Sequence, residues 1–151
     1  MPQFVKESVI EAPVEAVFAF HERPDAFELL QPPWDKVEII TPPSGLEVGT
    51  KVSLFTWVGP FKQRIEAEHI GYEKNVFFED TMNSGPFKSW RHKHLFFEHE
   101  DGCRLRDEIE YEAPMGFLGR LADPIAVRPR LEKMFDYRHD ITRKYVLGHL
   151  D

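Results

Sequence analysis

From residue 36 to about residue 113, apolar and polar positions alternate with a period of two, and this pattern most limits the possible fold. Turn-forming residues interrupt the alternation, for example at residues 42–45, 59–60 and 101–102. The breaks predict six strands, near residues 36–41, 50–58, 61–71, 75–82, 87–99 and 103–113. Because the connections between them are short, we expect an antiparallel meander.

Helical patterns flank this region. Residues 4–11 alternate and predict a first strand, Pro13 opens a short helix, and residues 24–30 predict a second one. A helical turn at 117–122 and a long helix from about residue 129 to Gly148 follow the strands. The stripe of the long helix, at three- and four-residue spacing, consists of Leu131, Met134, Phe135, Arg138, Ile141, Thr142 and Tyr145. These elements predict one α+β domain over residues 1–151.

Composition and charge limit the classes of partner. The formal net charge of -7 opposes binding to nucleic acid or to an anionic membrane. No stretch approaches the ~20 apolar residues that cross a bilayer, and the first residues lack the pattern of a signal peptide. We therefore expect a cytoplasmic protein without membrane insertion, and a homodimer is compatible with these features. The single cysteine, Cys103, excludes an internal disulfide and is expected in the core.

The order strand, two short helices, six strands and long helix resembles the SRPBCC or START-like superfamily, which has the helix-grip fold. A narrower similarity, to bacterial polyketide cyclase-like or ligand-binding members, rests on Phe78, Asp80, Met82, Gly85-Pro86-Phe87, Trp90, His92, His94, Phe96, Asp107, Tyr111, Pro114 and Tyr137-Arg138. The resemblance implies a curved seven-stranded antiparallel sheet and a cavity between that sheet and the C-terminal helix. It implies neither a fixed catalytic residue nor a metal, and no cofactor is expected.

The strands 87–99 and 103–113 carry the most informative polar residues. Asp107 has the inward parity of its strand, and His92 and His94 share the inward parity of the partner strand. A tight turn at residues 101–102 places His94 opposite either Asp107 or Ile109, because register shifts that keep the faces intact come in steps of two. A carboxylate in an apolar interior needs a partner, and the candidates are the two histidines and Arg138.

This group allows several interpretations. It can be a structural clasp between helix and sheet, or it can be the polar end of a pocket, in which Asp107, Arg138 and the two histidines anchor a ligand. In the second interpretation Trp90, Phe96, Tyr111 and Phe135 are pocket walls. His92, His94 and Asp107 are the candidates for acid-base catalysis. The two histidines could also bind a metal with Asp107 or Asp80 as the third ligand, although we expect no metal.

Asp80 has the inward parity of strand 75–82, which makes it a candidate ligand contact. The alternative, slightly preferred from the sequence, is a strand-end residue that bonds to the turn at residues 85–86.

The leading hypothesis is that the protein binds a small hydrophobic molecule, such as a lipid, a polyketide-like aromatic or an isoprenoid. An enzyme that moves protons on such a ligand, a cyclase, dehydratase or isomerase, is the first alternative. A protein-interaction or stress-regulatory module is the second. The sequence contains no phosphate-binding loop and no nucleophile elbow, which disfavours nucleotide chemistry and serine nucleophiles.

Overall fold

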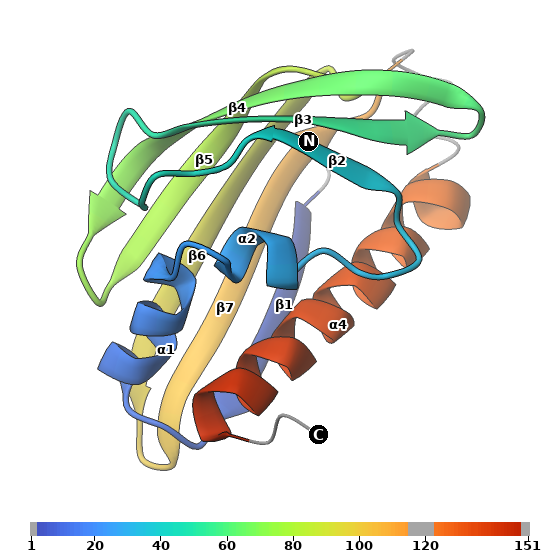
Figure 1. Ribbon diagram of the computed structural model, residues 1–151. Helices are drawn as coiled ribbons and strands as arrows, with labels where there is room; N and C mark the ends of the chain where they lie inside the picture. Colours follow the sequence, from blue (N-terminus) through green and yellow to red (C-terminus); the bar gives the residue numbers. More distant parts are fainter. Residues whose placement is uncertain (1–2, 115–122, 149–151) are drawn as a thin grey trace.

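The computed structural model describes residues 3–114 and 123–148, and it forms one curved seven-stranded antiparallel sheet with helices on its concave side (Figure 1). The strands are β1 (Gln3–Ile10), β2 (Val37–Thr41), β3 (Lys51–Val58), β4 (Phe61–Glu73), β5 (Phe77–Ser84), β6 (Ser89–His99) and β7 (Gly102–Glu112). The helices are α1 (Val14–Glu22), α2 (Ala26–Leu29), the π-helix η1 (Asp123–Val127) and α4 (Arg128–Leu147).

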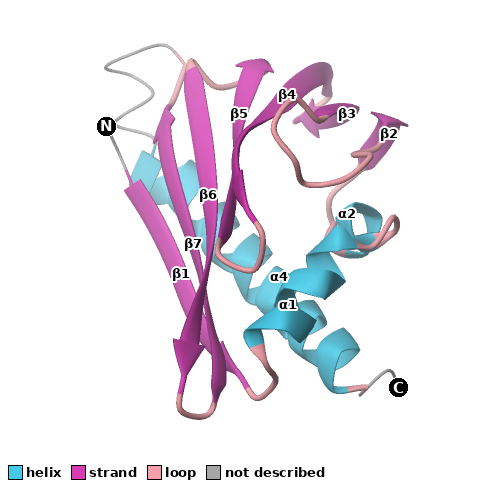
Figure 2. Ribbon diagram, turned by 90° about the vertical axis from the view of Figure 1, so that its left-hand side faces the viewer, coloured by secondary structure: helices cyan, strands magenta, loops and turns pink. Residues whose placement is uncertain are grey.

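The sheet has the order β1-β7-β6-β5-β4-β3-β2, so the last six strands form a meander and β1 joins its free edge. The register shifts between Ile39 and Thr41, between Glu66 and Ala67, and between His69 and Gly71. Irregularities of this kind bend a strand and increase its twist. Figure 2 shows the result: β2 and β3 curl away from the plane of β1, β7 and β6, and α1, α2 and α4 lie on one side of the sheet.

Two apolar clusters attach the helices to the sheet. Val17 and Phe18 of α1 are fully buried against Phe78, Phe96 and Leu105. Leu131 and Phe135 of α4 pack against Phe4, Ile109 and Tyr111. Leu131 and Phe135 therefore give α4 an apolar contact with the sheet over the N-terminal half of the helix.

The buried positions of α4 are Leu131, Phe135, His139 and Thr142, at spacings of four, four and three residues. Such spacing places all four on one face of a helix. The face is apolar at its N-terminal half and polar at its C-terminal half. Gly148 ends the helix in the left-handed conformation, with φ 76°, as predicted.

The predicted elements that the structure describes are confirmed within about two residues. The second short helix is a single turn, Ala26–Leu29, instead of residues 24–30. Arg23 ends α1 with an extended backbone, φ -62° and ψ 141°, as is usual for a residue before a proline, so the chain leaves the helical form before α2. The π-helix was not predicted, and the helical turn expected at 117–122 lies outside the described residues. Among the helices that the structure describes, none is long and apolar enough to cross a membrane.

Candidate functional site

A buried carboxylate, Asp107, contacts three histidines inside the fold. Its Oδ1 lies 2.7 Å from Nε2 of His92 and 3.1 Å from Nδ1 of His94. Its Oδ2 lies 2.6 Å from Nε2 of His139 on α4. The side chains of Asp107, His92 and His139 are at most 6% exposed. We call these four residues the Asp107 cluster.

The sheet register and the helix face together assemble the Asp107 cluster. His94 stands directly opposite Asp107 in the β6–β7 pair, which is one of the two predicted registers. His92 lies two residues away on the same face of β6 and reaches the carboxylate diagonally. His139 comes from the polar half of the buried face of α4, and its Nδ1 lies 2.8 Å from the hydroxyl of Ser8 on β1. The cluster therefore ties the helix to three strands.

His94 lies between two carboxylates. Its Nε2 is 3.0 Å from Oδ2 of Asp80, while its Nδ1 faces Asp107. Burial disfavours a charged ring, but the hydrogen bonds to Asp107 and Asp80 outweigh burial and raise the pKa of His94. Its ring also stacks on Phe78, with centroids 3.9 Å apart. In the absence of another cation, this environment favours the protonated ring.

The same buried environment shifts the pKa values of Asp107, Asp80 and His92. Burial alone would raise the pKa of Asp107, but hydrogen bonds from the three histidines outweigh it and hold that pKa well below its usual value. The pKa of Asp80 is also lowered, because the hydrogen bond from His94 offsets its burial. Burial and the nearby His94 lower the pKa of His92. Both carboxylates are therefore ionised at neutral pH.

Of the candidate partners of Asp107, His92 and His94 contact it, whereas the contact from α4 comes from His139 in place of Arg138. Arg138 donates from Nε to the carbonyl of Leu30, 3.2 Å away at the end of α2, and lies over the ring of Phe135. His139, one residue later on α4, makes the contact to Asp107 instead. The preferred interpretation of Asp80 is also wrong, because its carboxylate contacts His94 and not the turn at residues 85–86. The helix-to-sheet clasp exists, but it is a carboxylate-histidine contact.

The void beside the Asp107 cluster is small and partly open. A void of about 20 Å³ is lined by His21, Leu30, His92, His94, Leu105, Asp107, Phe135, Arg138, His139 and Thr142. This volume holds roughly one water molecule. This void is too small for a lipid or a polyketide, so a ligand of that class would need another space.

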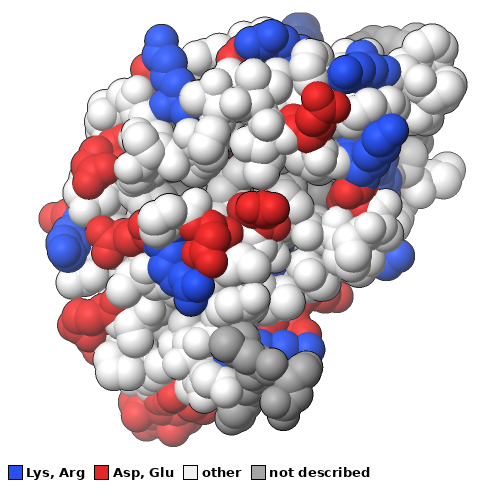
Figure 3. Space-filling model, viewed as in Figure 1, with Lys and Arg blue, Asp and Glu red and all other residues white. Residues whose placement is uncertain are grey.

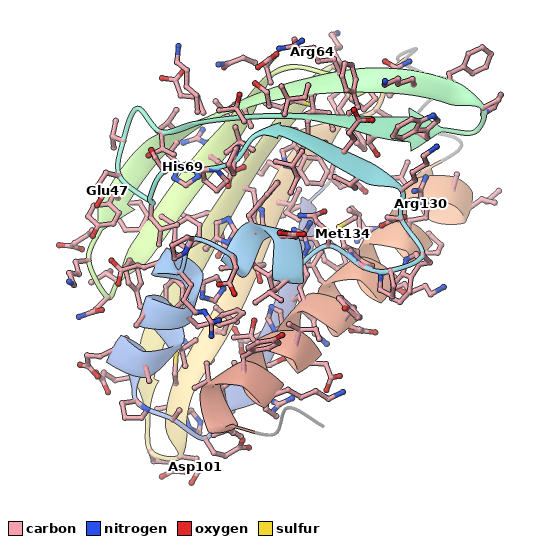
Figure 4. All side chains as sticks on the ribbon, in the orientation of Figure 1. Glu47, Arg64, His69, Asp101, Arg130 and Met134 are labelled. Carbon is pink, nitrogen blue, oxygen red and sulfur yellow. The ribbon has the colours of Figure 1, made fainter. Side chains whose placement is uncertain are left out.

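A larger hollow opens nearby, between α2 and β2. Its volume is about 600 Å³, and its lining residues are Pro24, Phe27, Glu28, Gln31, Pro32, Asp35, Val37, Ile39 and Pro42. Arg130, labelled in Figure 4 at the start of α4, lies 3.3 Å from Asp35 and offsets its charge. Figure 3 shows the face that carries α2, with acidic side chains near its middle.

The end of α2 separates the two spaces. Leu30 borders the small void, whereas the next two residues, Gln31 and Pro32, border the hollow. The hydrogen bond from Arg138 to the carbonyl of Leu30 holds this partition against α4.

The predicted wall residues lie in the core. Tyr111 and Phe135 are at most 1% exposed in one apolar cluster with Trp90 at its edge, and Phe96 belongs to the other cluster. Of these four residues, Phe135 lines the small void, and the linings of the two spaces include none of the other three.

Sequence reasoning missed two histidines. His139 is not a member of the predicted helix stripe, although it lies one residue from Arg138 and four from Phe135 and is buried. His21 lies against the void, and its Nδ1 donates to the carbonyl of Val17 at 2.8 Å. Burial lowers the pKa of His21 to about 4, so the ring is neutral at pH 7. The lining of the hollow was also missed, because α2 and β2 carry few residues with an obvious chemistry.

Known structures share this fold at low sequence identity. A protein of Thermus thermophilus is 17% identical with a TM-score of 0.76, and the alignment covers 99% of this chain and 100% of that one. Ara h 8.0201 is 15% identical with a TM-score of 0.69 and coverages of 97% and 98%. A nucleoside-diphosphate sugar epimerase of Corynebacterium glutamicum is 23% identical with a TM-score of 0.71, over 93% of this chain but 28% of that one.

Comparison with curated proteins finds no match. A family model described as "Polyketide cyclase / dehydrase and lipid transport" matches residues 10–134, which is most of the domain. This match agrees with the helix-grip architecture that the strands and α4 form. The chain belongs to the polyketide cyclase / dehydrase and lipid transport family.

Proposed function

We propose that the protein binds a small hydrophobic molecule in the hollow between α2 and β2. The observation that carries this proposal is the size and chemistry of the hollow. Its volume of about 600 Å³ lies within the range of roughly 300–1,000 Å³ that is usual for ligand pockets. Six of its nine lining residues are apolar, namely Phe27, Val37, Ile39 and three prolines, and the other three are Glu28, Gln31 and Asp35. The family description, which includes lipid transport, supports the same class of ligand.

The polar residues of the lining limit the ligand further. Glu28 and Asp35 bring carboxylates to the hollow, and Asp35 is paired with Arg130. An apolar ligand with a negative charge would meet the carboxylate of Glu28. We therefore expect neutral ligands, such as sterol-like, isoprenoid or uncharged aromatic molecules, to bind more tightly than fatty-acid anions.

The partition at α2 favours binding over catalysis. An acid-base enzyme needs its proton donor within hydrogen-bond reach of the ligand. Here Leu30 and Arg138 stand between the hollow and the histidines of the Asp107 cluster. A cyclase or dehydratase would require this contact to open, whereas a carrier uses the hollow as it is.

Two tryptophan substitutions on adjacent residues of β2 test the proposal. Ile39 lines the hollow, whereas Ile40 is absent from its lining and is 40% exposed. In a fluorescence titration with the neutral dye Nile red, we expect wild type and Ile40→Trp to bind alike and Ile39→Trp to bind at least tenfold more weakly. Equal binding by all three, or no binding by wild type, would argue against a site in the hollow. Native mass spectrometry of small molecules that co-purify with the protein would then identify the ligand.

A further inference from the structure

Two carboxylates, Asp107 and Asp80, lie beside the rings of His92 and His94. Asp107 faces one nitrogen of each ring, Nε2 of His92 at 2.7 Å and Nδ1 of His94 at 3.1 Å. The second nitrogen of each ring therefore remains for another partner. In His94 this second nitrogen is Nε2, which lies 3.0 Å from Oδ2 of Asp80.

This arrangement has the geometry of a metal centre with its supporting carboxylate. Ligand atoms of Asp80, His92 and His94 all lie within 4.8 Å of one another. Zinc–nitrogen distances are ~2.0–2.1 Å, so two ligands of one tetrahedral zinc lie roughly 3.3 Å apart. The Asp80–His94 pair already has about that separation, and a ligand atom of His92 lies within 4.8 Å of both. Histidines that bind metals commonly donate their other N–H to a carboxylate, which is the position of Asp107.

The backbone brings these residues together without strain in the sheet. Asp80 pairs with His92 in the β5–β6 ladder, and His92 and His94 point to the same face of β6. Their rings are 3.6 Å apart between centroids. All three side chains are at most 20% exposed, so water competes little for their lone pairs.

We propose that Asp80, His92 and His94 bind a divalent metal ion of the zinc type, with Asp107 as the carboxylate that orients both rings. Two carboxylates bring two negative charges to this region, and Arg138, which lies near both, balances one of them. Three protein ligands leave one position of a tetrahedral zinc open, and the adjacent void has room for one water molecule. The proposal does not depend on the hollow between α2 and β2.

Cobalt serves as a spectroscopic probe of this site. Protein stripped with EDTA is titrated with Co²⁺, and visible ligand-field absorption reports coordination by nitrogen ligands. We expect wild type to bind Co²⁺ with a tetrahedral or five-coordinate spectrum that Zn²⁺ abolishes. Asp80→Asn and His94→Gln should weaken binding about a hundredfold or more, and Asp107→Asn should weaken it about 10–100-fold.

Matched controls separate coordination from general damage. Glu79→Gln alters the neighbour of Asp80 on β5, and His99→Gln alters a histidine at the β6–β7 turn, beside the labelled Asp101 (Figure 4). Both should keep wild-type affinity. In wild type, Zn²⁺ should shift the ring-nitrogen NMR signals of His92 and His94 and leave that of His99 in place, which requires no variant to fold.

The proposal is overturned if wild type shows no Co²⁺ or Zn²⁺ binding at about millimolar metal, or if Asp80→Asn and His94→Gln bind as well as Glu79→Gln. Nile red binding to the EDTA-treated protein is measured in parallel. Because the dye occupies the hollow and the metal does not, loss of one signal without the other shows which proposal has failed.

Discussion

Replacement of Asp107 by asparagine should be among the most destabilising substitutions in the sheet. The side chain keeps its size but loses the charge that accepts hydrogen bonds from three histidines. A hydrogen bond to a charged group contributes about 1.5–3 kcal/mol. Two of the three donors, His92 and His139, have side chains at most 5% exposed, so water does not replace the lost acceptor.

The expected loss follows from these two buried contacts. Two hydrogen bonds to a charge give about 3–6 kcal/mol, and removal of one member of a buried charged pair generally costs about 3–5 kcal/mol. We therefore expect Asp107→Asn to lower the free energy of unfolding by about 3–5 kcal/mol. In a protein of this size each kcal/mol shifts the melting temperature by roughly 2–4 °C, which gives a decrease of roughly 6–20 °C.

Urea unfolding at pH 7 with EDTA present, followed by circular dichroism, measures this loss without any contribution from metal. Asp136→Asn is the matched control, because Asp136 is 66% exposed and its ion pair with Lys6 lies at the surface. Surface ion pairs contribute about 0–1 kcal/mol, so the control should stay near wild type. A loss of less than about 1 kcal/mol for Asp107→Asn would refute the view that the carboxylate joins helix to sheet.

Acid should remove the difference between wild type and Asp107→Asn. The folded-state pKa of Asp107 is depressed, so its contribution is present above the usual carboxyl pKa of about 3.9 and is lost as the pH falls through the folded-state value. Unfolding measured from pH 7 down to the acid limit of the folded protein should show the two stability curves converging at the acid end. Parallel curves over the whole range would mean that Asp107 is not ionised in the folded protein.

Three further predictions concern single residues. His21 has a folded-state pKa of about 4, against about 6.5 in the unfolded chain. Between pH 7 and pH 4, the free energy of unfolding of wild type should therefore fall by up to about 3 kcal/mol relative to that of His21→Gln, measured by urea unfolding. A difference that does not change with pH would contradict the burial of a neutral ring. Cys103 is fully buried and its pKa is raised to about 11. Alkylation of its thiol by iodoacetamide at pH 8 should therefore occur only through unfolding of the protein. Rapid reaction of the native protein would contradict this placement. Gly102 has φ 139°, and a side chain there would meet the backbone carbonyl of Ile10. In thermal unfolding, Gly102→Ala should therefore destabilise the protein by more than about 2 kcal/mol, whereas Gly59→Ala, with open space around it, should cost about 1–2 kcal/mol. Equal losses would show that the contact with Ile10 is relieved easily.

Much of the fold was predictable because the signals of its strands are local. Alternation along β7 separates inward Asp107 from outward Glu108, and a short turn, which the structure places at residues 100–101, limits the register to even steps. The sequence alone therefore predicts that His94 lies next to Asp107. Long helices are equally local, because the stripe on α4 and Gly148 mark its face and its end.

The partner that α4 offers to Asp107 was not predictable, because it depends on how the helix is rotated and how far it slides along the sheet. Arg138 and His139 are adjacent on the helix, about 100° apart around its axis, so a small rotation decides which one reaches Asp107. The burial of the side chain decides which of these two residues contacts Asp107. The long arginine side chain reaches the Leu30 carbonyl at the edge of α2, while the compact imidazole fits 2.6 Å from the carboxylate inside the core. A hydrophobic stripe alone therefore identifies the buried face, but the polar contacts on that face follow from side-chain length and from the elements, here α2 and β1, that close around the helix.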